Sequence, residues 1–172
     1  MKLNNVDLER ISKEAQAIKA DPSKGKRVNK LEATWSTDPS KPQLQATVKY
    51  EQGQVVMECD SPTFMGGEGR RPGPLHYCIM GFAACYTSTF ATSAAAKNIS
   101  LKSLSVAAEC ELDFSKAYGV NENPIVKNAT FTVNVKSDAP RSKLEEVKEE
   151  ALAKCPGIFV LRNNIPVTAR IA

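Results

Sequence analysis

The sequence contains few of the residues on which metal sites and hydrolytic triads depend. Among 172 residues there is one histidine, His76, and the five cysteines show no Cys-x-x-Cys spacing. A zinc site usually needs four cysteine or histidine ligands, and a Ser-His-Asp triad needs a histidine beside its nucleophile. His76 precedes Cys85 by nine positions on a predicted helix, so at about 100° per residue the two side chains point to opposite sides. We therefore expect no metal and interpret His76 as a structural residue.

Long hydrophobic runs are also missing. The longest weakly polar stretch, residues 78–96, is interrupted by threonine and serine, whereas a membrane helix needs about 18 consecutive apolar residues. The first ten residues lack the apolar segment of a signal peptide. An odd number of cysteines without a signal peptide argues against a secreted disulfide framework. These features predict a cytoplasmic protein with reduced thiols and no membrane partner.

Charge and composition are those of an ordinary globular protein. Lysine and arginine number 23 against 19 acidic residues, and 42% of the residues are hydrophobic. The one basic cluster comprises Lys24, Lys26, Arg27 and Lys30, and no aromatic residues alternate with it to stack on bases. We interpret the cluster as a solvated linker and expect no nucleic-acid partner.

Hydrophobic periodicity predicts an α+β fold with antiparallel sheets. The chain is expected to begin with a helix over residues 8–18, with Asn5 as its N-cap, and a linker over 23–26. Strands over 33–35, 44–50 and 55–59 and a loop over 61–73 then lead to a long helix from Pro74 to near Asn98. After it come strands over 104–114 and 129–135, a helix from Pro140 to Cys155, a turn over 157–162 and a last strand over 167–171. Residues 1–26 are predicted to form an N-terminal appendage, and residues 27–172 the main domain.

The long helix is predicted to be central. From His76 to Ala96 it has no charged residue, and a helix that is apolar or small on every side is buried on every side. A chain of this length has little material to surround it. Either both sheets wrap the helix or a second subunit covers it.

The cysteines are the remaining candidates for chemistry. Cys59 and Cys110 fall in the inward register of their strands and are interpreted as packing residues. Cys78 and Cys85 share one helix face, but their Cα atoms are expected about 10 Å apart, beyond the roughly 7 Å that a disulfide spans. Cys155 precedes a proline, and as the N-cap of a following helical turn its thiolate would be favoured by free backbone N–H groups. The alternative is that the Cys-Pro pair is incidental.

Three segments resemble the OsmC/Ohr family of peroxide-reducing proteins. The first is residues 74–87, PLHYCIMGFAACYT, a proline-led helix with Gly-aromatic-Ala-Ala-Cys in its middle. The second is LSVAAECELD, which is similar to the following strand of the family. The third is SDAPRSKLEEVKEEALAKCP, which is similar to the second helix and its terminal cysteine. With the closing NNIPVTARI, the resemblance covers residues 28–172.

The resemblance implies an OsmC-like fold with a long buried central helix in an intertwined homodimer. It implies that Cys85 attacks a hydroperoxide and that Cys155 resolves the sulfenic acid as a disulfide, which a dithiol reductant then reduces. Metal, haem and flavin are not needed, because the thiolate itself breaks the weak O–O bond. The expected role is a thiol-dependent hydroperoxide reductase in oxidative stress defence.

The sequence departs from the family at the groups that activate the first cysteine. Hydroperoxide resistance enzymes of the family carry an arginine after the first strand and a glutamate at the start of the long helix. Here residues 36–41 contain no arginine, and Leu75 takes the glutamate position. Glu68, Arg70 and Arg71 are expected to supply these charges instead. The alternative is a non-catalytic dimer that binds an apolar or thiol-containing small molecule.

Overall fold

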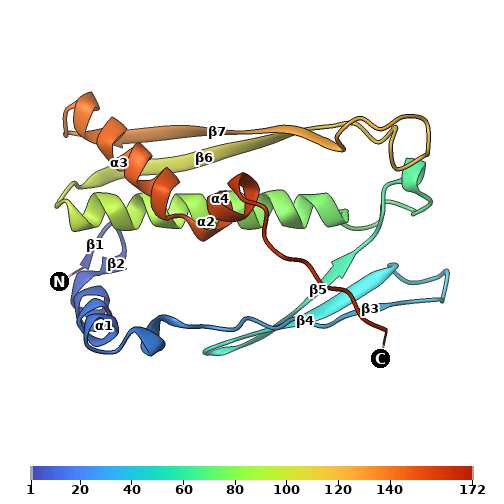
Figure 1. Cartoon of the computed structure of the whole chain (residues 1–172), viewed down its shortest axis with the longest axis horizontal. Coiled ribbons are helices and arrows are strands. Elements are labelled where there is room, and N and C mark those ends of the chain that lie inside the picture. The colour runs from blue at the N-terminus through green and yellow to red at the C-terminus, as the bar shows by residue number, and fades with distance from the viewer. Residues whose placement is uncertain (1, 172) are drawn as a thin grey trace. The chain divides into compact units, whose positions relative to one another are not determined.

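The computed structural model describes residues 2–171, which form two compact units (Figure 1). One unit comprises residues 15–78, and the other comprises the residues before 15 and after 78. Helices α1 (Leu8–Ala20) and α2 (Pro74–Ala96) each run from one unit into the other. None of the described helices is both long and apolar enough to cross a membrane.

The unit of residues 15–78 is built on an antiparallel sheet. Its strands β3 (Ala33–Trp35), β4 (Leu44–Tyr50) and β5 (Gly53–Cys59) are neighbours in chain order, which confirms the three predicted strands. Tyr50 pairs with Gly53, so a two-residue turn joins β4 to β5. Short 3-10 turns at Pro22–Gly25 and Thr63–Met65 lie in the predicted linker and loop. The linker and the loop therefore contain local structure that composition did not indicate.

The other unit packs helices against a long two-stranded sheet. Strands β6 (Leu101–Leu112) and β7 (Val126–Ser137) pair antiparallel, and helices α3 (Arg141–Lys154) and α4 (Pro156–Arg162) follow them. Figure 1 shows β6 and β7 running alongside α2. The buried core combines side chains of α2, α3, α4 and the segments around them: Tyr86, Phe90, Ala94, Ile99, Val147, Ala151, Cys155 and Ile158. Alternate residues of both strands pack on this core, which confirms the period-2 prediction.

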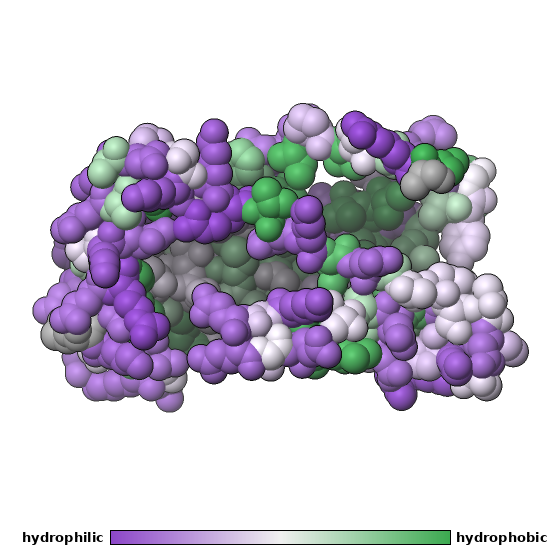
Figure 2. Space-filling view, turned by 90° about the horizontal axis from the view of Figure 1, so that it is seen from below, coloured by the Kyte–Doolittle hydropathy of each residue, from purple (hydrophilic) through white to green (hydrophobic). Residues whose placement is uncertain are grey.

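Helix α2 has the predicted length, and within one chain it is buried on one side only. Tyr86 and Phe90 are buried, whereas Met80 is 55% exposed and Gly81, Ala84 and Ser88 are also exposed. The exposed side carries no charge. Figure 2 shows hydrophobic side chains reaching the surface among polar ones on one face of the molecule. An uncharged helix face of this kind is typical of a surface that another protein covers.

The predictions for the C-terminal segment were wrong in two places. Residues 157–162 belong to helix α4 rather than to a turn, and residues 163–171 form no strand. A strand requires a neighbour to receive its backbone hydrogen bonds, and within one chain these residues pair with no strand among those described. Val167 is 87% exposed, which shows that this apolar side chain does not pack on the core of its own chain.

The N-terminus begins with a small hairpin that the sequence did not indicate. Strands β1 (Lys2–Leu3) and β2 (Val6–Asp7) pair through a turn in which Asn4 and Asn5 have positive φ angles of 53° and 62°. The predicted N-cap at Asn5 was therefore wrong. Asp7 caps α1 instead, because its carboxylate accepts the backbone N–H of Arg10 at 3.2 Å. Asparagine tolerates left-handed backbone better than most residues.

Asn4 fastens this hairpin to the start of β6. Its side-chain amide donates to the carbonyl of Ile99 at 2.8 Å, and its side-chain oxygen accepts the N–H of Leu101 at 2.8 Å. We expect Asn4→Gly, which keeps the left-handed turn but removes both bonds, to lower the free energy of unfolding by about 1–3 kcal/mol. Asn4→Ala should cost roughly 1–2 kcal/mol more through backbone strain. Urea denaturation measures both, and equal stabilities for wild type and Asn4→Gly would contradict the assignment.

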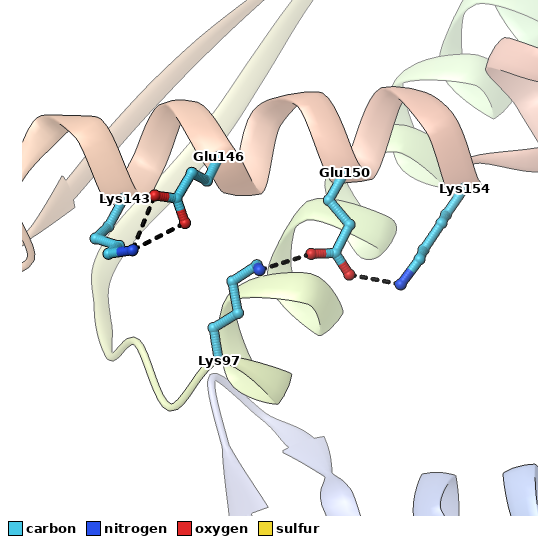
Figure 3. A network of polar contacts seen from close by, with 5 residues as sticks. All are labelled: Lys97, Lys143, Glu146, Glu150 and Lys154. Carbon is cyan, nitrogen blue, oxygen red and sulfur yellow. Dashed lines mark hydrogen bonds and ion pairs between the residues drawn. The ribbon is translucent and has the colours of Figure 1, made fainter.

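Ion pairs line one side of α3, and one of them reaches Lys97, just after the end of α2 (Figure 3). Glu150 accepts from Lys154 at 2.6 Å and from Lys97, which directly follows α2, at 3.0 Å. These two lysines hold the pKa of the Glu150 carboxyl below its usual value, with the hydrogen bond from Lys154 the larger cause. Lys143 pairs in the same way with Glu146 at 2.8 Å. The Lys97–Glu150 pair joins the end of α2 to the helix that terminates at Cys155.

Candidate active site

Two cysteines that lie 70 positions apart in the sequence meet in the core of the unit that contains β6 and β7. The sulfur of Cys155 lies 3.5 Å from the sulfur of Cys85 and donates its S–H to it. Cys155 is 1% exposed, whereas Cys85 is half-buried. A disulfide bond is about 2.05 Å long, so the two sulfur atoms need to approach by only roughly 1.5 Å to bond. The geometry brings a partly accessible thiol and a fully buried one within reach of each other.

A break between two helices positions Cys155. Its N–H bonds to Ala151 as the last hydrogen bond of α3, and its carbonyl accepts from Phe159 as the first of α4, at 3.0 Å and 2.9 Å. Pro156 has no N–H to continue α3, but proline suits the first position of a new helix. The predicted N-cap position is confirmed. The Cys155 side chain makes no capping hydrogen bond, so its sulfur is directed to Cys85.

The backbone of Gly157 contacts Cys85 closely. Its N–H donates to the Cys85 sulfur and lowers the pKa of that thiol, opposing the effect of burial. A Cβ atom at this position would lie 3.2 Å from the Cys85 Cβ and 3.4 Å from a ring carbon of Phe82. Helical N–H groups at this end of α4 were expected to favour a thiolate of Cys155. In the structure the N–H of Gly157 stabilises the Cys85 thiolate instead.

The net effect on Cys85 is a raised pKa. Burial is the largest cause, because it disfavours the charged thiolate. The Gly157 N–H lowers the pKa, and the hydrogen bond and charge of Cys155 raise it further. The thiolate fraction of Cys85 therefore increases as the pH rises through the alkaline range. A reaction that uses this thiolate should accelerate in the same direction.

The three charged residues expected to activate Cys85 belong to the other unit, where they pair with one another and with nearby groups. Arg71 forms an ion pair with Glu58 at 2.6 Å. Arg70 lies 3.8 Å from Glu68, its side chain donates to the Pro39 carbonyl, and its backbone N–H donates to Asp60. The activating role of Glu68, Arg70 and Arg71 remains a prediction.

The remaining cysteines and the histidine occupy other environments. Cys59 is buried at the end of β5 and Cys110 is half-buried in β6, as their registers predicted, while Cys78 is exposed. His76 accepts the N–H of Gly73 at 3.2 Å, a local bond at the start of α2. Within residues 2–171, no three side chains of histidine, cysteine, aspartate or glutamate gather into a group that could hold a metal ion.

Sequence reasoning missed Gly157 as part of this site. The available signal was a glycine two residues after a cysteine and directly after a proline, which we interpreted as a turn. Thr89 was missed as well: its hydroxyl donates to the Cys85 carbonyl at 2.9 Å from one helical turn further on. This bond satisfies a backbone group beside the candidate nucleophile without touching the sulfur.

A family model for OsmC-like proteins matches residues 67–170. The chain belongs to the OsmC-like protein family. The matched range contains Cys85, Cys155 and Gly157, and it covers α2, both long strands and the two C-terminal helices. The N-terminal hairpin and α1 lie outside it, as does the sheet of β3, β4 and β5.

Solved structures of OsmC-like proteins share this fold. An OsmC-like protein from Mycoplasma pneumoniae is 18% identical with a TM-score of 0.58, and the alignment covers 79% of this chain and 88% of that one. An organic hydroperoxide resistance protein OsmC from Legionella pneumophila is 21% identical with a TM-score of 0.59, covering 81% and 93%. An organic hydroperoxide resistance protein from Elizabethkingia anophelis is 19% identical with a TM-score of 0.53, covering 81% and 92%. Comparison with curated proteins finds no match.

Proposed function

We propose that this OsmC-like protein is a thiol peroxidase that reduces hydroperoxides, organic ones in particular. The single observation that carries the proposal is the 3.5 Å separation of the Cys85 and Cys155 sulfur atoms, one half-buried and the other fully buried. Family membership and the names of the Legionella and Elizabethkingia proteins support the choice of substrate class. We propose oxidative stress defence in the cytoplasm as its setting.

The proposed reaction needs only the two thiols, the hydroperoxide and a reductant. The Cys85 thiolate attacks the outer oxygen of R–O–O–H, an S–O bond forms, the O–O bond breaks, and the alkoxide leaves as ROH after taking a proton. Cys155 then attacks the sulfur of the sulfenic acid, an S–S bond forms, and water leaves. A dithiol reductant restores both thiols by disulfide exchange.

We propose a homodimer as the working assembly. The uncharged, exposed side of α2 supports it, as do the exposed apolar residues of the C-terminal segment, such as Val167. Strands β6 and β7 each have one neighbour in their sheet, so a strand from a second chain can extend it. Light scattering during size-exclusion chromatography should give twice the mass of the chain, and a monomer would contradict the proposal.

The experiment that tests the function is peptide mapping after one equivalent of cumene hydroperoxide. Trypsin leaves Cys78 and Cys85 together on residues 71–97 and Cys155 on residues 155–162, so the Cys78→Ser variant makes the linkage unambiguous. We expect these two peptides to be joined by a disulfide after oxidation and to separate after reduction. Recovery of both cysteines as free thiols, with the hydroperoxide unconsumed, would overturn the proposal.

A non-catalytic role is the second candidate, and one observation favours it. The unit of residues 15–78 contains an apolar cavity of about 200 Å³, with walls that include Leu31, Leu44, Met57 and Tyr77. A small apolar ligand could be bound there. Native mass spectrometry of freshly purified protein distinguishes the two functions: a bound adduct without peroxide turnover supports the binding role, and a clean mass with rapid turnover removes it.

A further inference from the structure

Two cysteines in the unit of residues 15–78 take no part in the proposed reaction. Cys59 is the last residue of β5 and is 5% exposed. Cys78 lies in the first turns of α2 and is exposed. Neither forms a disulfide in the structure. One buried thiol and one accessible thiol in the same unit repeat the combination found at Cys155 and Cys85.

Contacts on both sides of these cysteines hold their segments together. The hydroxyl of Tyr77 donates to the carbonyl of Glu58 at 2.6 Å. Tyr77 precedes Cys78 in the sequence, and Glu58 precedes Cys59. The N–H of Asp60, on the other side of Cys59, donates to the Pro72 carbonyl at 3.4 Å. The start of α2 therefore lies against the end of β5.

The helix register directs Cys78 toward the same region. Tyr77 and Cys78 lie three and four positions after Pro74, so the three residues lie on one side of α2, within about 100° of one another. Pro74 and Tyr77 line the apolar cavity together with Cys59. Cys78 follows Tyr77 directly and is itself exposed, so its thiol lies beside this cavity rather than in its wall.

Electrostatics distinguish the two thiols. Burial raises the pKa of Cys59, and the nearby charges of Asp60 and then Cys78 raise it further. Cys59 is therefore held in its protonated form, whereas Cys78 is open to solvent. The accessible thiol is the one that an oxidant meets first.

We propose that Cys59 and Cys78 form a second redox-sensitive thiol pair, which a low-molecular-weight hydroperoxide converts to a disulfide. The Cys78 thiolate attacks the hydroperoxide, an S–O bond forms, the O–O bond breaks, and ROH leaves with a proton. The sulfur of Cys59 then attacks Cys78, an S–S bond forms, the S–O bond breaks, and water leaves. Two thiols and one hydroperoxide thus yield one disulfide, one alcohol and one water.

This disulfide would fasten the end of β5 to the start of α2. The chain between them is the loop of residues 61–73, which contains Glu68, Arg70 and Arg71. Oxidation would close that loop covalently, and a cross-link of this kind restricts mainly the unfolded chain. The modified protein should therefore melt at a higher temperature than the reduced one.

The test uses the full chain with Cys85→Ser and Cys155→Ser, which keeps Cys59, Cys78 and Cys110. Trypsin places Cys59 on residues 50–70, Cys78 on residues 71–97 and Cys110 on residues 103–116. After one equivalent of hydrogen peroxide we expect residues 50–70 linked to residues 71–97 within one chain. Adding Cys78→Ser should abolish the link, and adding Cys110→Ser should leave it unchanged.

Several results would overturn this inference. Cys59 and Cys78 could both stay open to alkylation, Cys78 could proceed to sulfinic acid while Cys59 remains free, or the link could join two chains. The variant lacks the Cys85–Cys155 pair, so its result is independent of the proposed peroxidase reaction. A Cys85–Cys155 link in Cys78→Ser protein without a Cys59–Cys78 link here would sustain the proposed function and reject this pair alone.

Discussion

Replacement of Cys85 by serine should reduce hydroperoxide consumption to the uncatalysed background, a loss on the order of a thousandfold or more. A serine hydroxyl is far less acidic than a thiol and does not attack the O–O bond. The measurement is the disappearance of cumene hydroperoxide with dithiothreitol as the reductant. It is made in a Cys78→Ser background, so that the second thiol pair contributes nothing.

Cys155→Ser should separate the two steps of the reaction. The Cys85 sulfur still attacks, so each chain should consume one equivalent of hydroperoxide, and the sulfenic acid should persist because its neighbouring thiol is missing. Dimedone labelling followed by mass spectrometry detects that acid on residues 71–97. Cys110→Ser is the matched control, since this half-buried cysteine lies in β6, and it should retain full turnover. Undiminished turnover by Cys85→Ser would refute the mechanism.

Replacement of Gly157 should slow the reaction without removing either thiol. Gly157→Pro eliminates the N–H that stabilises the Cys85 thiolate. A hydrogen bond to a charged group contributes about 1.5–3 kcal/mol, and its loss should raise the pKa of Cys85 further. Less of Cys85 is then present as the thiolate at neutral pH. The rate at neutral pH should therefore drop about ten- to a hundredfold, the factor that corresponds to this free energy.

The pH–rate profile shows whether a slower reaction results from the lost hydrogen bond or from the added side-chain atoms at position 157. Loss of the bond in Gly157→Pro should move the midpoint of the profile to higher pH, and the plateau should fall as well, because proline also adds a Cβ atom close to Cys85. Gly157→Ala keeps the N–H but adds a Cβ atom 3.2 Å from that of Cys85, so it should lower the plateau and leave the midpoint in place. Gly25→Ala is the control, because its added Cβ would make only an ordinary contact with Ile18, at 3.4 Å. An unshifted midpoint in Gly157→Pro would remove Gly157 from the activation of Cys85.

The periodicity of hydrophobic residues was sufficient to predict most of the helices and strands. The alternating residues of β4 placed both ends of that strand, and the patterns of α2, β6 and β7 placed their ends to within three residues, because one face of each element meets the core. Helix α4 was missed, since seven residues that begin with Pro-Gly are too short for a periodic signal and begin like a turn. The strand expected over residues 167–171 failed for a different reason: pairing requires a neighbour, and a sequence pattern does not say whether one exists.

The site was only partly predictable. Spacing alone excluded a Cys78–Cys85 bridge and left Cys155 as a candidate, whereas the assignment of Cys85 and Cys155 to one reaction came from the family resemblance. The break at Pro156 was visible in the sequence, but the contact of Gly157 with Cys85 depends on how α4 packs against α2, which no local pattern encodes. The hydrogen bonds of Asn4 reach residues 95 and 97 positions away, so they could not be predicted from a local sequence pattern either.

Those bonds of Asn4 also set an order of events during synthesis. The hairpin is synthesised before its partners at Ile99 and Leu101, which are made only after the whole of α2. At a synthesis rate of about 5–20 residues per second, these partners are made roughly 5–20 s after Asn4. The hairpin therefore remains unattached until well after it is made, and nascent chains halted before residue 99 should leave it open to proteases.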